Sequence, residues 1–158
     1  MKFLTKIIII IFIFLPSSLL SDDKADMILI EKSLRSLKLL KDGNIIKTYP
    51  IDLGFDPIGH KFYEGDGKTP EGLYYISKII VNSEFYISFK ISYPNKWDKI
   101  NAKEINKNPG GYIMIHGYPK NSKKYTKDWT NGCIALSNKN IEELSKNINI
   151  KIPVLILK

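Results

Sequence analysis

The single cysteine of this 158-residue chain, Cys133, is its strongest candidate for covalent chemistry. It follows Gly132, and His116 lies seventeen residues earlier, at the end of the apolar run 112–115. A thiol attacks a carbonyl carbon as the thiolate, and a neighbouring imidazole lowers the pKa of the thiol and accepts its proton. A separation of seventeen residues allows an excursion that brings two strand ends side by side. The pair therefore indicates nucleophilic acyl chemistry, with Cys133 as the attacking residue and His116 as its base.

Other interpretations of the same residues stay open at this point. Free cysteine is among the most buried residue types, so Cys133 can equally be inert core with His116 at the surface. A zinc site built from His60, His116 and Cys133 is weakly indicated, because no two of these ligands are closely spaced. The stretch 65–69 lacks the first glycine of a phosphate-binding loop and is followed by Pro70, which excludes that motif.

The N-terminus has the layout of a secretory signal. Two lysines precede nine uninterrupted apolar residues, 7–15, and a small-residue cleavage position follows near Ser21. Nine residues are far fewer than the roughly 20 that span a bilayer, although an uncleaved N-terminal anchor remains the alternative. We therefore expect a signal peptide at 1–21, a flexible lead-in at 22–26, a single domain at 27–158, and export to the periplasm or cell envelope.

Export makes the cysteine count informative. Oxidising compartments favour paired cysteines, and one cysteine cannot form a disulfide within its own chain. An unpaired cysteine in such a compartment is buried and inert, linked to another chain, or a reactive thiol. If the chain is exported, the single thiol of Cys133 is therefore a stronger clue to function than it would be in a cytosolic protein.

The net charge of the chain limits the classes of binding partner that we expect. The formal net charge is +8, and it falls to +6 when Lys2 and Lys6 are removed with residues 1–21. The lysines are scattered rather than clustered in a stripe, so nucleic acid is not expected as a partner. Attraction to an anionic envelope polymer or membrane surface is one explanation, and simple solubility is the other. Direct membrane contact is expected only through an uncleaved N-terminal segment.

Strand patterns dominate the rest of the sequence. Short apolar runs and turn signals predict strands, and the Asp42-Gly43 pair predicts a hairpin between two of them. The glycine-rich stretch 54–72 predicts a long functional loop, and 95–106 predicts a short helix or a loop. Ser137 or Asn138 is a suitable N-cap for a second helix. The expected strands are 27–31, 34–40, 45–51, 73–81, 85–93, 112–115, 134–136 and 151–157. The sequence therefore predicts one mostly-β domain with one or two helices.

Two blocks of the sequence resemble a known family. The segment from Tyr112 through His116-Gly117 to Thr130-Asn131-Gly132-Cys133-Ile134 resembles the catalytic signature of the L,D-transpeptidase catalytic domain family, the YkuD-type domain. In that family a histidine-glycine pair precedes a Ser/Thr-x-Gly-Cys stretch. The loop 65–72 is similar to a second block of the same family, and the resemblance covers roughly residues 27–157.

The resemblance implies a β-sandwich-like fold and a site with assigned roles. It implies Cys133 as the nucleophile, His116 as base and later acid, and the Gly132 and Cys133 amides as oxyanion donors. Thr130 would place a hydroxyl near the thiol, and Asn131 and Gly117 would shape the site. The residues expected in the substrate cleft are Tyr112, Tyr118, Trp129, Gly67 and Thr69, although Trp129 is more simply explained by packing under the cysteine loop. The resemblance implies no cofactor and no metal.

The implied substrate is the stem peptide of peptidoglycan, and carbapenem-type inhibitors are expected to acylate Cys133. The sequence departs from the commonest family pattern at two positions: Asn131 stands where many members carry histidine, and Ala135 where many carry arginine. It is similar to a branch with Trp-Thr-x-Gly-Cys-Ile-Ala. Three functions therefore remain open: an L,D-transpeptidase, a peptidoglycan L,D-hydrolase that uses the same two residues, and an inactive wall-binding module.

Overall fold

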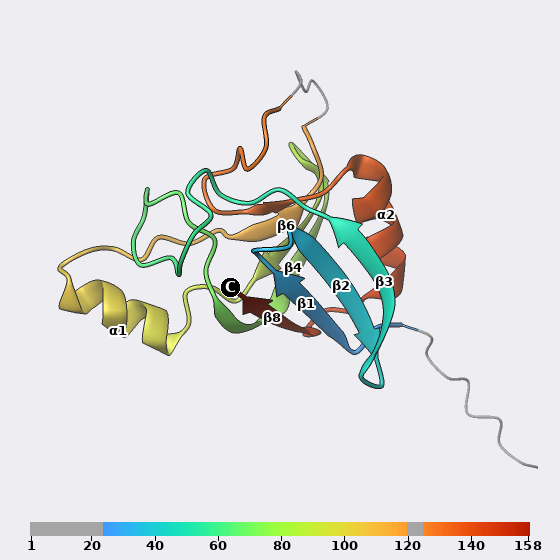
Figure 1. The fold of residues 1–158 in the computed structure, drawn as a ribbon, viewed down its shortest axis with the longest axis horizontal. Coiled ribbons are helices and arrows are strands. Elements are labelled where there is room, and N and C mark those ends of the chain that lie inside the picture. The colour runs from blue at the N-terminus through green and yellow to red at the C-terminus, as the bar shows by residue number, and fades with distance from the viewer. Residues whose placement is uncertain (1–23, 120–124) are drawn as a thin grey trace, which may run out of the picture.

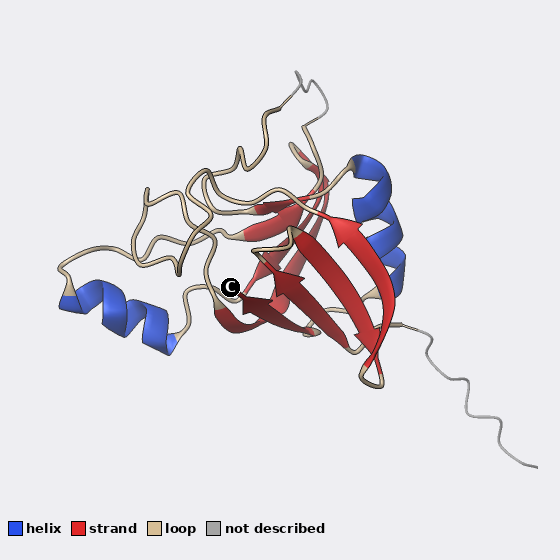
Figure 2. Ribbon diagram, viewed as in Figure 1, coloured by secondary structure: helices blue, strands red, loops and turns tan. Residues whose placement is uncertain are grey.

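The structure is a computed structural model that describes residues 24–119 and 125–158, so the predicted signal peptide at 1–21 lies outside the described residues. Eight strands and two helices make up this part of the chain (Figures 1 and 2). The elements in chain order are β1 (Met27–Glu31), β2 (Ser36–Lys41), β3 (Asn44–Pro50), β4 (Gly72–Ser83), β5 (Tyr86–Ile91), α1 (Lys96–Glu104), β6 (Met114–His116), β7 (Ile134–Ala135), α2 (Asn138–Asn147) and β8 (Pro153–Leu157). The predicted mostly-β class with one or two short helices is confirmed, with two helices present in the described residues.

All eight strands belong to one bent sheet, in the order β3-β2-β1-β8-β4-β5-β6-β7. The long strand β4 joins its two halves, because its first residues pair with β8 and the rest pair with β5. Most neighbours are antiparallel, and the exceptions are β1 with β8 and β6 with β7. Buried side chains from both halves, among them Ile28 and Ile115, belong to one apolar cluster, which gives the domain its sandwich-like core.

Local signals in the sequence explain where several elements begin and end. Asp42 and Gly43 both have positive φ, at 50° and 76°, as a two-residue hairpin turn between β2 and β3 requires. Asn95 caps α1 and forms a capping box with Asp98, and the Ser137 hydroxyl caps α2 by accepting from the Asn140 N–H. These side chains satisfy backbone donors that a helix start leaves unpaired.

The end of the predicted lead-in is anchored to the domain. Ala25 is buried, its N–H donates to the carbonyl of Asn147, and the N–H of Asp26 donates to the carbonyl of Leu40. Residues 24–26 therefore pack on the domain instead of forming a free linker. In the described part of the chain, neither helix has the length and apolar character needed to cross a bilayer.

Candidate active site

The register between β6 and β7 places Cys133 and His116 on the same face of the sheet. Ile115 pairs with Ile134 and His116 with Ala135, so Cys133, one residue before β7, lies beside Met114. Alternate residues of a strand point to the same face, which puts Met114, His116 and Cys133 on one side. Ile115 and Ile134, both 0% exposed, fill the core on the other side. The sheet itself therefore brings the two reactive residues together.

His116 and Cys133 line one cleft of about 410 Å³. Its walls come from the end of β4, the β4–β5 turn, β5, β6 and the segment that precedes β7. The residues that line it are Ile80, Ser83, Glu84, Phe85, Ser88, Tyr112, Met114, His116, Trp129, Thr130, Asn131 and Cys133. Of the predicted cleft residues, Tyr112 and Trp129 are present, together with Asn131 and Thr130.

The imidazole of His116 is held in one tautomer. Its Nδ1 lies 2.6 Å from the carbonyl oxygen of Gly117, which can only accept a hydrogen bond, so Nδ1 carries the proton. Nε2 of the neutral ring then keeps its lone pair and can accept a proton. Gly117 is itself fixed, because its N–H donates to the carbonyls of Phe85 and Ile87. A backbone carbonyl thus orients the base, where many Cys/His sites use a side chain.

Burial makes both reactive groups neutral at rest. It lowers the pKa of His116 below its ordinary value, against a smaller opposing effect of the hydrogen bond to Gly117. Burial also raises the pKa of the Cys133 thiol, against smaller effects of the Met114 backbone and the charge of Lys61. The pair therefore rests as thiol and imidazole, and the proton moves when the sulfur attacks.

Aromatic rings enclose the imidazole. Phe85 packs against His116 with ring centroids 4.6 Å apart, and Trp129 meets it edge-on at 5.8 Å. Trp129 stacks in turn on Tyr125, at 4.0 Å. The interpretation of Trp129 as a packing residue therefore agrees with its contacts, and the same ring also forms a wall of the cleft. Phe85 was not among the candidate residues, since nothing in the sequence places a hairpin tip beside His116.

Thr130 fixes the turn that presents the cysteine. Its hydroxyl donates to the carbonyl of Cys133 at 2.7 Å and accepts from the N–H of Gly132 at 3.1 Å. Thr130 therefore acts on the backbone of the turn, instead of only placing a hydroxyl near the thiol as expected. The N–H of Gly132 is committed to this bond, so its expected role as an oxyanion donor is not available in this arrangement.

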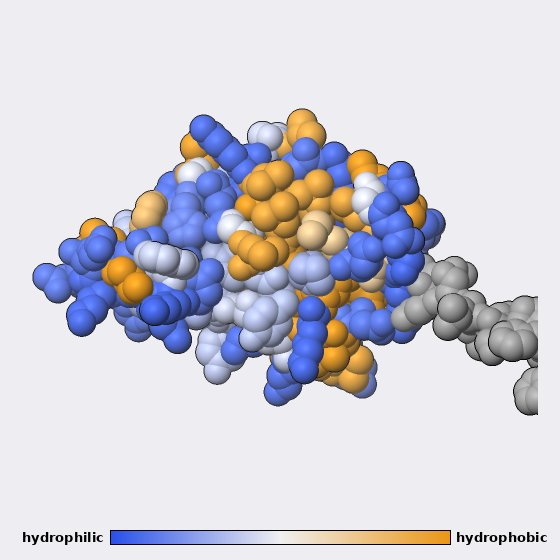
Figure 3. Space-filling model, turned by 90° about the horizontal axis from the view of Figure 1, so that it is seen from below, coloured by the Kyte–Doolittle hydropathy of each residue, from blue (hydrophilic) through white to orange (hydrophobic). Residues whose placement is uncertain are grey.

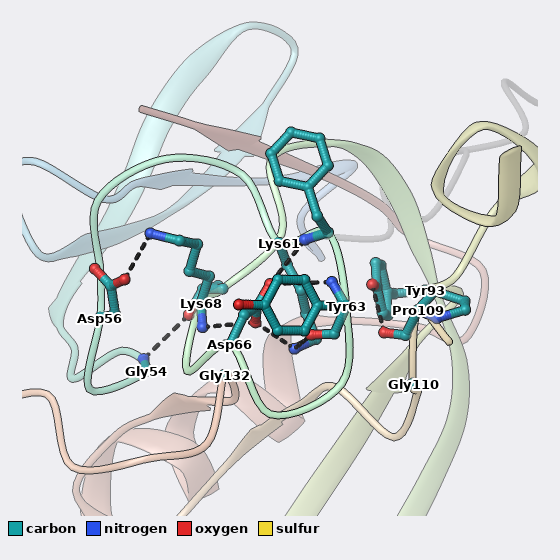
Figure 4. Close-up of polar contacts among 12 residues, drawn as sticks. Gly54, Asp56, Lys61, Tyr63, Asp66, Lys68, Tyr93, Pro109, Gly110 and Gly132 are labelled. Atoms are coloured by element: carbon teal, nitrogen blue, oxygen red, sulfur yellow. Dashed lines mark hydrogen bonds and ion pairs between the residues drawn. The ribbon is translucent and has the colours of Figure 1, made fainter. Parts of the chain in front are cut away.

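Three glycines allow the loop 54–72 to pack directly behind the cysteine turn (Figure 4). A Cβ on Gly132, whose φ is 122°, would lie 2.5 Å from the carbonyl oxygen of Lys68. A Cβ on Gly54 would lie 2.0 Å from the carbonyl oxygen of Gly67. Such approaches exclude any side chain. Gly67 is thus a packing residue behind the site, and Thr69, 0% exposed, holds the N–H of Gly54 instead of lining the cleft as predicted.

The carboxylate of Asp66 organises the same loop. It accepts from the N–H groups of Phe62, Tyr63 and Lys68 and from the ammonium of Lys61 at 2.7 Å. Although burial opposes it, the Lys61 ammonium and these amides hold the pKa of Asp66 below its ordinary value. The second sequence block of the family resemblance therefore serves as a rigid support under Cys133.

Tyr118 does not line the cleft as predicted, and its hydroxyl group instead anchors the segment that follows His116. Its hydroxyl donates to the carboxylate of Asp52 at 2.8 Å, and Asp52 also accepts from the N–H of Asp128. Arg35 holds Asp128 through its guanidinium, and the Asp52 backbone exchanges two hydrogen bonds with Ala135. The sequence did not indicate this hydrogen-bond network, because its residues are far apart along the chain and match no motif.

The cleft contains little charge. Among the residues that the structure describes, Glu84 is the only carboxylate that lines it, and no lysine or arginine does. Ala135 is fully buried in β7, so no side chain at this position supplies the cation that many family members carry there. The remaining polar groups include the hydroxyls of Ser83 and Ser88, 2.9 Å apart. The polarity of the site thus rests mainly on neutral hydrogen-bonding groups.

His60 lies away from the reactive pair. Its Nδ1 accepts from the N–H of Glu71, and its Nε2 lies 3.4 Å from a carboxylate oxygen of Asp98. It lines a different depression beside α1. The weakly indicated set of His60, His116 and Cys133 is therefore not assembled into one site.

Known proteins share this fold and parts of this sequence. Pgp2 of Campylobacter jejuni, described as a helical cell shape determining protein, is 32% identical, with a TM-score of 0.67 over 85% of this chain and 48% of its own. Bd1075 of Bdellovibrio bacteriovorus is 27% identical, with a TM-score of 0.59 over 85% of this chain and 48% of its own. The Escherichia coli protein YafK is 29% identical over 68% of this chain and 39% of its own length.

This chain thus spans about half the length, or less, of these relatives. The sequence model of the L,D-transpeptidase catalytic domain, YkuD, matches residues 25–156, nearly all of the described domain. The order of the two motif blocks, the shared sheet and the family match agree with one another. The chain therefore belongs to the L,D-transpeptidase catalytic domain family.

Proposed function

We propose that the chain is a peptidoglycan L,D-transpeptidase that acts through a thioester on Cys133. The observation that carries this proposal is the shared cleft of Cys133 and His116, in which the carbonyl of Gly117 leaves Nε2 of the imidazole as a base. The family match makes the stem peptides of peptidoglycan the substrate class. Such chemistry belongs in the cell envelope, which is consistent with the export signal expected at residues 1–21.

The reaction proceeds in two acyl transfers. Sγ of Cys133 attacks the carbonyl carbon between the diamino acid and the D-alanine that follows it, while Nε2 of His116 takes the thiol proton. The C–N bond breaks, and the imidazolium returns the proton to the departing D-alanine amine. An amine then attacks the thioester, gives its proton to His116, and releases the thiol with a new amide bond.

The N–H of Cys133 itself is the backbone donor that we assign to the developing oxyanion. The N–H of Gly132 is bound to Thr130, and the Thr130 hydroxyl also holds the carbonyl of Cys133, which fixes the direction of the adjoining peptide groups. A preorganised donor stabilises the tetrahedral intermediate because it needs no reorientation during the reaction. Thr130 therefore contributes by positioning the turn.

A peptidoglycan L,D-hydrolase is the second candidate, and a specific observation supports it. In the described ranges 24–119 and 125–158 no lysine or arginine lines the cleft, and Ala135 stands where many members carry arginine, so this part of the site offers no fixed cation to orient an acceptor carboxylate. Water needs no such group. A third candidate, an inactive wall-binding module, is opposed by the retained Cys133 and His116 and by the neutral, oriented base.

Intact-mass measurement of the thioester tests the proposal. The protein is incubated with tetrapeptide-bearing muropeptides, and an adduct equal to the substrate minus D-alanine is expected on the native protein and absent from Cys133→Ala. A carbapenem is expected to add covalently at the same residue. If the native protein forms no adduct with either compound and releases no D-alanine, the acyl-transfer function is wrong.

Product analysis separates the two enzymatic candidates. Crosslinked dimers in the digest indicate transfer to an amine, whereas free tripeptides indicate transfer to water. Addition of a D-amino acid sharpens the result, because a transpeptidase exchanges it for the terminal D-alanine and a strict hydrolase does not.

A further inference from the structure

A second depression lies further along the molecule's long strand, between α1 and the first residues of β4. It consists of two adjoining hollows of about 490 and 500 Å³ that share Tyr75, Ser92 and Asn95. We call it the lysine groove. Its lining residues are Leu73, Tyr74, Tyr75, Ser92, Pro94, Asn95, Lys96, Lys99, Ile100, Lys103, Lys151 and Pro153.

All the charged residues that line the lysine groove are positive. Lys96, Lys99 and Lys103 project from one face of α1, at helical spacings of three and four residues, and Lys151 lies on the opposite side, just before β8. No aspartate or glutamate lines the groove, and no carboxylate in the described ranges pairs with these four lysines. By contrast, lysines such as Lys32 and Lys61 are matched to carboxylates.

The neutral groups of the groove also favour an anion. Oδ1 of Asn95 is used by the N-cap of α1, which leaves its Nδ2 hydrogens as donors. The oxygen of Ser92 accepts from the N–H of Tyr75, so its hydroxyl hydrogen is directed elsewhere. The groove therefore offers ammonium, amide and hydroxyl donors together, which is the chemistry that recognises carboxylates.

The floor of the groove is apolar. Leu73 is 62% exposed and Tyr75 is 49% exposed, and Pro153 and Ile100 extend this surface on either side. In Figure 3 the α1 end of the molecule is mostly hydrophilic, and hydrophobic atoms gather over the sheet beside it. A ligand that fits both features is a chain that carries carboxylates at intervals along an aliphatic body.

We propose that the lysine groove binds a carboxylate-bearing stem peptide of peptidoglycan, a second peptide besides the one in the cleft. The proposal rests on the proposed function, because it takes its ligand class from there. Stem tetrapeptides end in a D-alanine carboxylate and carry methyl and methylene groups, which match the ammonium walls and the apolar floor. The groove thus holds the enzyme on the polymer while the cleft reacts.

The two regions are neighbours along the sheet. Ser88, in the cleft, and Ser92, in the groove, are four residues apart, which corresponds to about 13 Å along a strand. A fully extended tetrapeptide spans about 14 Å, so a peptide that fills the cleft does not also fill the groove. We therefore assign the groove to a second stem peptide of the same polymer.

Sedimentation with purified peptidoglycan sacculi tests the groove. The full chain with Cys133→Ala is used, so that the polymer is not altered during binding. Lys96, Lys99 and Lys103 are changed together to glutamine, and the matched control changes Lys41, Lys139 and Lys158 to glutamine, with the same loss of charge. The groove variant is expected to bind about tenfold more weakly, because three exposed ion pairs with the ligand are lost. The control is expected to bind like the parent.

A second measurement identifies the chemistry of the ligand. A soluble disaccharide tetrapeptide is titrated against the parent and the groove variant, and the same compound with its carboxylates amidated is the comparison. Groove-dependent binding is expected only for the carboxylate form. Vesicles with anionic phospholipid are the competing probe, and residues 1–23 are the same in every variant, so their contribution cancels.

Equal sacculus binding by the groove and control variants overturns the proposal, provided that both melt at the parent temperature. Groove-dependent binding to vesicles without groove-dependent binding to sacculi also overturns it and makes the groove a membrane contact. Neither outcome touches the thioester test, which uses the native cysteine. An absent thioester with groove-dependent sacculus binding leaves the groove standing and removes the enzymatic function.

Discussion

The candidate cleft and the lysine groove differ in the charge of the residues that line them. The cleft is lined by aromatic rings, hydroxyls and a single carboxylate, and its two reactive groups rest neutral because burial shifts both pKa values towards the neutral forms. The groove presents four lysines and no carboxylate. Both regions belong to a chain with a formal net charge of +8. Among the described residues, no lysine lines the cleft, although Lys90 borders it with its ammonium 4.5 Å from the centroid of the Tyr112 ring, whereas four lysines line the groove.

The physical reason lies in what each task requires. Proton transfer between a thiol and an imidazole needs groups that are dry, close and oriented. Capture of a flexible anionic polymer needs charges that remain in water and act at a distance. Lys61 is an exception to this separation, because its charge favours the Cys133 thiolate while its ammonium is bound to the buried carboxylate of Asp66.

The largest expected effect is a loss of activity in the cleft that leaves binding through the groove unchanged. Cys133→Ala is expected to lower the rate of D-alanine release by at least about 10³-fold, because no other thiol exists in the chain. Binding to sacculi is expected to remain within about twofold of the native protein. Rate and sedimentation measurements on the same preparation check both statements, and a parallel loss of binding contradicts the separation.

The next largest effect comes from the support behind the cysteine. Gly132→Ala places a Cβ against the carbonyl of Lys68 at a φ that alanine adopts poorly, so we expect the free energy of unfolding to fall by about 1–3 kcal/mol. Acylation of Cys133 by a carbapenem is expected to slow by more than tenfold, and sacculus binding below the melting temperature to stay unchanged. Gly43→Ala, in an exposed hairpin turn with open space around it, is the control for a general effect of glycine replacement.

A change of pH acts on the cleft and leaves the groove alone. Because burial lowers the pKa of His116 below 6.5, kcat/KM is expected to hold at pH 6.5 and to fall about tenfold per pH unit only below that lowered pKa. Protonation also favours the unfolded chain, whose histidine has the higher pKa, so stability is lost as pH falls from about 6.5 to the lowered pKa of the folded protein. No histidine lines the groove among the described residues, so sacculus binding should be constant from pH 5.5 to 8. An acid limb centred at or above pH 6.5 contradicts the neutral, buried base.

The smallest effect is that of salt, and it acts on the groove alone. Raising the ionic strength from about 0.05 to 0.3 M is expected to weaken sacculus binding by roughly fivefold, since screening shortens the reach of exposed charges. The rate of carbapenem acylation at Cys133, which uses neutral groups, is expected to change by less than twofold. The groove variant should show a smaller salt dependence than its matched control, and equal dependence in both contradicts the role of the three lysines.

The sequence predicted most strands and the second helix, and left 95–106 as a short helix or a loop, because these signals are local. The Asp42-Gly43 turn, the N-cap of α2 and the strand at 27–31 match the structure closely. It also predicted Cys133 and His116 as a pair, through a family resemblance that the family match supports. Residue types and short spacings are sufficient for such inferences.

Several expected cleft residues lie elsewhere, for a common reason. Gly67 and Thr69 lie behind the turn that presents Cys133 and do not face the cleft. Tyr118 donates its hydroxyl hydrogen to Asp52 instead. A sequence block can indicate that a segment is close to a site, but it does not say which side of the backbone faces the ligand. For the same reason Phe85 was missed, although its ring contacts His116.

By itself, the sequence predicted Cys133 and His116 as the candidate reactive residues and determined the class of fold and the positions of the turns, since these depend on residue chemistry and neighbours along the chain. Only the tertiary structure decided which carbonyl orients His116, that Thr130 occupies the amide of Gly132, and that Lys96, Lys99 and Lys103 share a groove with Lys151. These are relations between segments that pair through a sheet. Strand register, burial and the direction of each side chain fix them, and none of the three can be derived from spacing alone.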